Sequence, residues 1–466
     1  MRINPEFRRN VWVQFTWTRL LAAPLLTVIA CYAFLLVNDH DYRLLQRIAE
    51  FVGGSVIVGL WGTRRAADSL AEEVSGGTWE SQRMSSLGAW QMTWGKLIGS
   101  ASFVWYCATI AFLVVLWASN RIEAAGGIGR PPLQVIFDFY VGGLVAQAAA
   151  FSIALLLLRK AAQYRRLTIT LAQTCGFLVY FLFVRGDFSE QLSVRFRADN
   201  LPSNDMFWTG GGHDLDVARA VAIGATCLWS IIAAYRLMRT ELQYRSLPWI
   251  WTLFLIFVLA VGRTASSAES AYGWLTLPFL GFVLLTYLSF FADNRDPVRY
   301  RWTLLALRGR KWFEVVSGIP WWIISYIFAA VSAVAIAWSL ADLAGVESTQ
   351  EPTPAVRMFI MAIQHPSASL ALVMLFMLRD LLVLLWLSCS PWRSKADVAG
   401  IIYLALAYWP LAAILWISDM THLLPVVAPI ATGNVGADFV PIGIELAFAV
   451  FLFYARWREI TRLKPR

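Results

Sequence analysis

Long apolar runs recur from one end of this chain to the other, and they constrain its fold more than any other feature. Runs of about 16 to 21 residues recur, close to the about 20 that an α-helix needs to cross the hydrocarbon core of a membrane. Of the 466 residues, 58% are hydrophobic and only 15% are charged, which excludes a soluble protein of several domains. We therefore expect an all-α, polytopic membrane protein.

The runs predict twelve transmembrane helices. These cover residues 20–37, 48–63, 97–117, 134–158, 167–184, 217–235, 247–262, 272–291, 320–341, 368–388, 398–417 and 440–455. Most of the 39 Lys and Arg residues fall in the segments on one side of this topology, so we expect both termini in the cytoplasm. Membrane orientation then explains the net charge of +9, and we expect no nucleic-acid partner.

The predicted topology repeats itself. A long cytoplasmic segment follows the second span and a short basic one follows the fourth, and the same order recurs after the eighth and tenth spans. This order predicts two parallel six-span halves, residues 20–235 and 236–466, made by internal duplication. A chance agreement between loosely bounded spans is the alternative.

Residues 1–19 predict a short helix in the membrane interface ahead of the first span. Asn4 is a capping residue and Pro5 occupies the first helical position, which together start a helix well. Phe7, Val11 and Phe15 belong to an apolar stripe on that helix.

The polar segment 64–96, between the second and third spans, has unusual chemistry for a connector. Its two adjacent glycines, Gly76 and Gly77, permit a sharp reversal because glycine tolerates positive φ. Thr78 is a helix-capping residue type and predicts a short helix running toward Leu87. One side of that helix is expected to be apolar, from the spacing of Met84, Leu87, Trp90 and Trp94.

This segment resembles the corresponding part of the ABC-2 type transporter permeases, the membrane subunits of one class of ABC exporter. In that family an acidic segment with Gly-Thr and a final Gly-Lys joins the second and third spans. The matching residues are Glu72, Glu73, Gly77, Thr78, Glu80, Leu87, Gly95 and Lys96. The N-terminal helix is similar too, although the family often has Glu where Asn10 stands.

The resemblance implies a permease subunit of an ATP-driven exporter in the bacterial inner membrane, working by alternating access. A coupling helix would dock on a separate ATP-hydrolysing subunit, expected in two copies, which would hold ATP and Mg; no cofactor is expected on this chain. The implied contact residues are Glu72, Glu73, Gly77, Thr78 and Glu80. An amphipathic interfacial linker without a partner is the alternative.

The sequence holds no motif for catalysis. It lacks the Gly-x-x-x-x-Gly-Lys-Ser/Thr loop for nucleotides, and His-Glu-x-x-His, Gly-x-Ser-x-Gly and Cys-x-x-Cys are also missing. The five cysteines lie in or at the ends of apolar runs without metal-ligand spacing. We expect neither catalytic residues nor a metal site.

In the second half, the counterpart of the coupling segment is the basic segment 292–319. It lacks the Gly-Thr pattern and predicts a basic amphipathic helix on the lipids of the inner leaflet.

Arg379 and Asp380 interrupt the tenth span, where each costs about 2.5 to 3.5 kcal/mol at mid-membrane. Adjacent residues point about 100° apart on a helix, so each is expected to need its own partner or a wet cavity. Two interpretations follow. The pair lines a substrate path or gate, or it is a structural pairing, for example with Glu445.

Two other functions remain open. The repeat and the charged pair also suit an ion-coupled secondary transporter. A membrane-embedded transferase, using residues of the external loop Arg185–Asp216, is the third.

Overall fold

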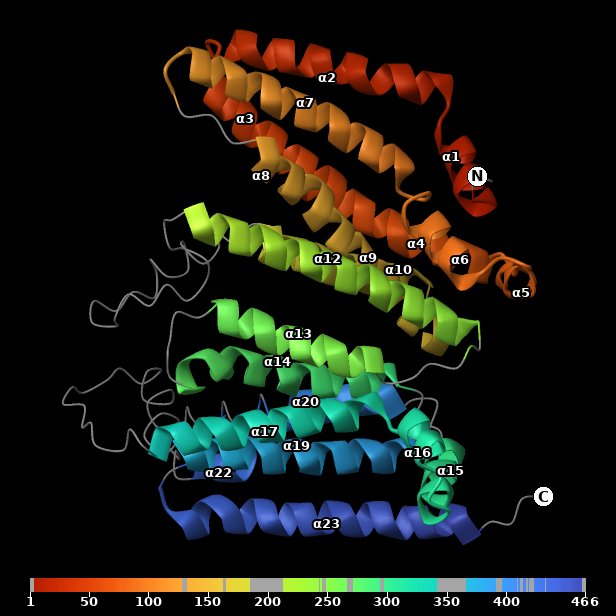
Figure 1. The fold of residues 1–466 in the computed structure, drawn as a ribbon, viewed down its shortest axis with the longest axis vertical. Coiled ribbons are helices and arrows are strands. Elements are labelled where there is room, and N and C mark those ends of the chain that lie inside the picture. Colours follow the sequence, from red (N-terminus) through yellow and green to blue (C-terminus); the bar gives the residue numbers. More distant parts are fainter. Residues whose placement is uncertain are drawn as a thin grey trace, which may run out of the picture. The chain divides into compact units, whose positions relative to one another are not determined.

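The computed structural model contains only helices among the regular elements of the residues that it describes (Figure 1). The described residues are 4–462 except for 128–131, 162–164, 185–212, 243, 245–248, 266–270, 294–296, 342–365, 391–395, 409, 411–413, 416–417, 419–422 and 432. Within them, eight helices are long and apolar enough to cross a membrane, and three more, in α10, α13 and α20, are apolar but shorter. The prediction of an all-α, polytopic membrane protein is confirmed.

The chain divides into two compact units, Met1–Ser246 and Leu247–Arg466. The first unit therefore ends at Ser246, shortly after the predicted boundary between residues 235 and 236. The first unit comprises α1 (Pro5–Gln14), α2 (Trp17–Val37), α3 (Tyr42–Glu50), η1 (Phe51–Gly62), α4 (Thr63–Ser75), α5 (Trp79–Arg83), α6 (Ala89–Leu97), α7 (Ser102–Ala124), α8 (Pro132–Ile136), η2 (Phe137–Val141), α9 (Gly142–Ala161), α10 (Arg165–Val184) and α12 (His213–Glu241).

The second unit comprises α13 (Trp249–Ala265), α14 (Ala271–Ala292), α15 (Pro297–Arg308), α16 (Trp312–Gly318), α17 (Trp321–Ala341), α19 (Pro366–Ser388), α20 (Ala396–Tyr408), α22 (Leu424–Val427) and α23 (Val435–Arg462). Each of the twelve predicted spans falls on a helix, although the span at 398–417 continues past α20 into residues that are partly outside the description. The predicted span at 217–235 lies on α12, a helix of 29 residues.

The two units share an order of packing. The second span of each unit packs along the third, as η1 and α3 do on α7 and α14 does on α17. The fourth span packs along the sixth, α9 on α12 and α19 on α23, and also along the fifth. Corresponding spans of the two units therefore pack on corresponding neighbours, while a parallel internal duplication stays a prediction.

The second span is one continuous helical rod from Tyr42 to Ser75, built of α3, η1 and α4 in succession (Figure 1). Its middle part, η1, is a π-helix, a wide form that is common at functional sites. A Cβ on Gly53 would stand 2.7 Å from the Phe139 ring, so only glycine permits this close approach of η1 to η2. The rod is thereby packed closely against η2 near the start of η1.

Candidate functional site

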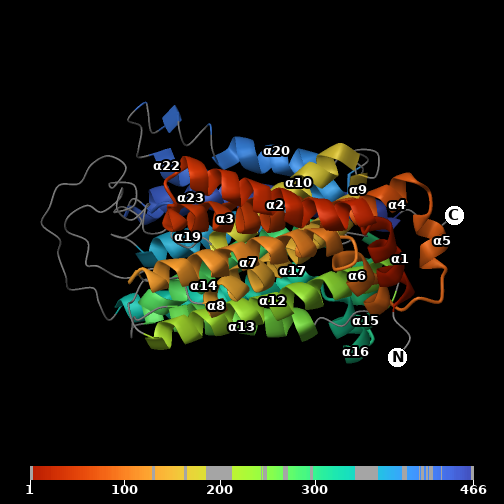
Figure 2. The same cartoon turned by 90° about the horizontal axis from the view of Figure 1, so that it is seen from above.

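The polar segment 64–96, which begins within the end of the rod, folds as an arrangement of short helices at one end of the first unit (Figure 2). Helix α4 ends at Ser75, and Gly77 reverses the chain with a φ of +68°, as the glycine pair predicts. Helix α5 then begins at Trp79, directly after Thr78. Helix α1 packs against α6, which brings the N-terminal segment to the same place.

One buried lysine lies at the centre of this arrangement. The side chain of Lys96, from α6, is 1% exposed, and its Nζ pairs with the carboxylates of Glu73 on α4 and, at 3.3 Å, of Glu6 on α1. It also donates to Oε1 of Gln82 on α5 at 2.9 Å, and it lies 5.8 Å from the centre of the Trp79 ring. A single ammonium group thus contacts all three of the other helices.

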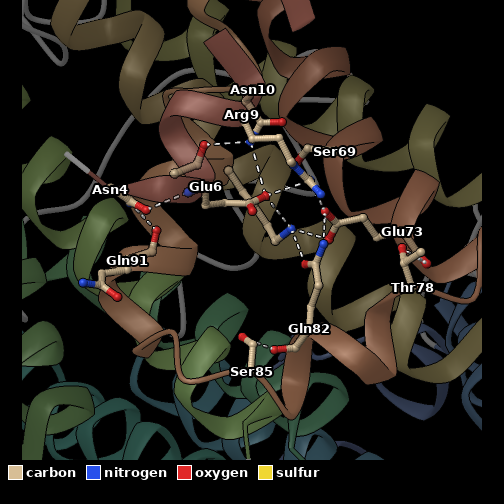
Figure 3. Close-up of polar contacts among 12 residues, drawn as sticks. Asn4, Glu6, Arg9, Asn10, Ser69, Glu73, Thr78, Gln82, Ser85 and Gln91 are labelled. Atoms are coloured by element: carbon tan, nitrogen blue, oxygen red, sulfur yellow. Dashed lines mark hydrogen bonds and ion pairs between the residues drawn. The ribbon is translucent and has the colours of Figure 1, made fainter. Parts of the chain in front are cut away.

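Arg9 completes the charge balance of this lysine cluster, which we define as Glu6, Arg9, Glu73, Gln82 and Lys96. Figure 3 shows Glu6, Arg9, Glu73 and Gln82 pointing toward one another. Its Nη2 lies 2.9 Å from Glu6 and 2.8 Å from Glu73. Gln82 donates in turn to Oε1 of Glu73 at 2.7 Å. Two cations therefore face two buried carboxylates, as burial of charge requires.

Backbone acceptors on α6 hold α1 in place beside the cluster. Asn4 donates to the carbonyl of Gln91 at 2.7 Å, and Asn10 donates to the carbonyl of Gly95 at 3.2 Å. Asn4 also accepts from the backbone of Glu6, so it caps α1 as predicted. The N-terminal helix is thus tied to the segment that leads into the third span.

The five predicted contact residues lie in different environments. Glu73 is buried in the lysine cluster, so its carboxylate serves internal pairing. Glu72, Gly77, Thr78 and Glu80 are exposed around the turn and the start of α5. Glu80 pairs with Arg83 one turn later at 3.0 Å while its side chain stays 71% exposed.

The extent of the predicted short helix was wrong. Instead of one helix running from Thr78 toward Leu87, with Trp90 and Trp94 on the same apolar side, the structure has two helices, and the turn between them contains Ser85 and Gly88. Ser85 donates from its hydroxyl to the carbonyl of Gln82 at 2.7 Å, a side-chain bond that competes with helix continuation. Thr78 occupies the capping position without a capping bond, since its hydroxyl donates to the carbonyl of Glu73.

Sequence reasoning did not foresee the roles of Glu6, Arg9 and Gln82. The available signal was the charge of Glu6 and Lys96 beside apolar runs, because such charges need partners. Glu6 and Lys96 are each other's partners although they lie 90 residues apart in the sequence, and so distant a pairing could not be identified from it.

The second unit holds its own buried charge cluster, within its spans. Arg379 on α19 donates through Nε and Nη2 to Oδ1 of the adjacent Asp380, at 3.0 and 2.8 Å. Its Nη1 pairs with Glu445 on α23. Asp380 is fully buried and accepts from three hydroxyl groups, which belong to Tyr287 at 2.8 Å, Tyr403 at 2.9 Å and Tyr408 at 2.6 Å.

We define this arginine cluster as Arg379, Asp380, Glu445 and the three tyrosines. Each of the two adjacent residues has partners of its own, Glu445 for Arg379 and the tyrosine hydroxyls for Asp380, as expected. The two side chains also pair with each other, because the long arginine side chain folds back onto its neighbour. The suggested pairing with Glu445 is present. The cluster joins α14, α19, α20 and α23, while a role of Arg379 and Asp380 in a substrate path remains a prediction.

The basic segment of the second unit also differs from its prediction. It forms two helices, α15 and α16, in place of one, with a break at Arg310, whose φ is +54°. Lys311, the residue after the break, forms an exposed pair with Glu314 at 3.5 Å. The buried carboxylate here is Asp293, which pairs with Arg299 at 2.9 Å.

Comparison with known proteins does not identify this site: no protein-family model, no curated protein and no solved structure matches the chain.

Proposed function

We propose that this chain is the transmembrane permease subunit of an ATP-driven exporter of the ABC-2 type, located in a bacterial inner membrane with both termini in the cytoplasm. Separate subunits, two per complex, would hydrolyse the ATP. The observation that carries the proposal is the lysine cluster, which links the short exposed helix α5 to α1, α4 and α6 through one buried ammonium group.

Such a link suits the transmission of force. A partner that pushes on the exposed residues around Glu80 displaces Gln82 on the same short helix. Gln82 binds Glu73 and Lys96, so the displacement reaches α4 and, through the continuous rod, the π-helical second span. A linker with no partner has no need of three buried charges in this position, since burying them costs several kcal/mol per ion before pairing.

The roles of the predicted contact residues follow from their exposure. The exposed residues would contact the partner, and they are Glu72, Gly77, Thr78 and Glu80. Glu80 supplies the carboxylate of α5, and its side chain is 71% exposed. Glu73 acts inside the segment and holds α4 to α1 and α6.

Native mass spectrometry of the chain, purified gently from its own host, tests this proposal. One copy bound to two nucleotide-binding subunits is the expected composition. Two copies with two such subunits would contradict the fused arrangement of two halves. No nucleotide-binding subunit at all, in preparations that keep other complexes intact, would overturn the proposal.

An ion-coupled carrier is the second candidate, because the arginine cluster favours it. Two carboxylates, Asp380 and Glu445, share the one cation Arg379 within the spans, which leaves one negative charge for a transported ion or proton. Transport that follows an ion gradient without any ATPase would favour this function. The loop that a transferase would use lies largely outside the described residues.

A further inference from the structure

A small cavity opens beside the first span, on the same unit as the lysine cluster but separate from it. Its volume is about 210 Å³. It lies where α1 leads into α2, next to the end of η1 and the start of α7, and its lining consists of Gln14, Arg19, Trp61, Arg65, Phe103 and Val104.

The walls of this cavity are fixed by contacts of their own. Gln14 accepts from the hydroxyl of Ser102 at 3.3 Å and from the backbone of Phe103 at 3.2 Å, and its amide donates to the carbonyl of Ser100. The Phe103 ring packs edge-on against Trp61, with ring centres 5.8 Å apart. The cavity is thus preformed, with an aromatic wall beside a polar one.

Two guanidinium groups line the cavity without a carboxylate. Arg65 forms no hydrogen bond or ion pair with any residue that the structure describes. Arg19 donates to the carbonyl of Gln14 at 3.3 Å, a neutral acceptor. The neighbouring lysine cluster balances every charge, whereas the exposed Arg19 and the half-buried Arg65 face one cavity without a carboxylate in its lining. Two guanidinium groups in this arrangement are suited to binding an anion.

The position of the two arginines identifies the source of that anion. Arg19 comes just before the apolar part of α2, and Arg65 comes just after η1, so the predicted topology places both at the cytoplasmic surface of the membrane. We propose that this cavity binds the phosphate of an anionic phospholipid headgroup from the inner leaflet. Basic pockets between transmembrane helices on that side are suited to such headgroups, and Trp61 and Phe103 offer an apolar surface to the glycerol backbone.

Lipid binding by the full chain tests the proposal independently of any ATPase partner. The probes are dioleoyl phosphatidylglycerol and dioleoyl phosphatidylcholine, added to the detergent-purified protein and counted by native mass spectrometry. We expect phosphatidylglycerol to be retained preferentially. Each arginine near a lipid surface contributes ~1 kcal/mol, so Arg19→Gln or Arg65→Gln should weaken retention about fivefold and the double variant about 30-fold.

Arg64→Gln is the matched control. It removes the same charge from the next residue of α4, which is exposed and does not line the cavity. Retention by this variant should equal that of the original protein, and the charge-preserving double variant Arg19→Lys/Arg65→Lys should keep most of it. Both single variants are measured beside the double one, so that misfolding of the latter does not end the test.

Three results would overturn the proposal. Equal loss in Arg64→Gln would show a general effect of surface charge. Equal retention of the two lipids would show that the cavity does not distinguish a headgroup with a net negative charge from a zwitterionic one. Displacement of phosphatidylglycerol by millimolar inorganic phosphate would assign the cavity to a free anion instead of a lipid.

Discussion

The two buried charge clusters of this protein solve the same problem in different places. The lysine cluster lies where four helices meet at the end of the spans, and it balances two carboxylates with two cations. The arginine cluster lies among the spans, with two carboxylates for one cation and three tyrosine hydroxyls as extra donors to Asp380. Among the spans, tyrosine hydroxyl groups thus donate the hydrogen bonds to a buried carboxylate that a second cation donates in the lysine cluster.

The difference in redundancy sets the order of the expected effects. If Lys96 is removed, Arg9 still contacts both carboxylates of its cluster. If Arg379 is removed, the arginine cluster keeps no cation.

The largest effect is expected from Arg379→Met. The substitution leaves Asp380 fully buried and Glu445 half-buried without a positive charge, and breaking a buried pair in this way costs about 3 to 5 kcal/mol. The yield of monodisperse protein and the unfolding temperature in detergent measure the loss. Arg379→Lys, which keeps the charge, should lose less. Normal yield with abolished transport would instead indicate that the pair acts in a substrate path.

A smaller effect is expected from Lys96→Met, about 2 to 3 kcal/mol, because hydrogen bonds to charged groups are lost while Arg9 keeps both carboxylates paired. The unfolding temperature again reports it. Lys311→Met is the control from the corresponding segment of the second unit, where an exposed pair contributes about 0 to 1 kcal/mol. If Lys96→Met and Lys311→Met lowered the unfolding temperature equally, the buried lysine would contribute no more than the exposed one, contrary to this prediction.

The smallest effect has the opposite sign. Gln147 on α9 is fully buried, and neither its amide nitrogen nor its oxygen has a hydrogen-bond partner among the described residues. Gln147→Leu should therefore stabilise the protein, by about 1 to 2 kcal/mol. Gln173→Leu is the matched control, since Gln173 donates to the carbonyl of Leu60 at 3.1 Å and should bring no gain. A lower unfolding temperature for Gln147→Leu would mean that its amide is satisfied.

The sequence predicted the features that depend on local chemistry. Apolar length located the helices, glycine tolerance located the reversal at Gly77, and the charges in an apolar run located the arginine cluster. The cap formed by Asn4 follows from the same local rules.

The features that depend on distant contacts escaped prediction. The lysine cluster joins Glu6, Glu73 and Lys96, and the sequence around each of these residues does not indicate that it contacts the other two. The break between α5 and α6 was missed because the apolar spacing continues across it, while Ser85 diverts backbone bonding and Gly88 adopts an extended conformation. A pattern of spacing therefore does not by itself define the length of a helix.

Contact between α5 and an ATP-hydrolysing subunit is the central claim, and site-specific photo-crosslinking tests it most directly. A photoreactive amino acid replaces Glu80 in α5 or, as the matched control, Glu314 in α16, both exposed carboxylates in corresponding segments. Membranes of the native host are then irradiated. We predict an adduct with a nucleotide-binding protein from position 80 and a weaker one or none from position 314. No such adduct from position 80 or from the exposed neighbour Met84 would contradict the claim.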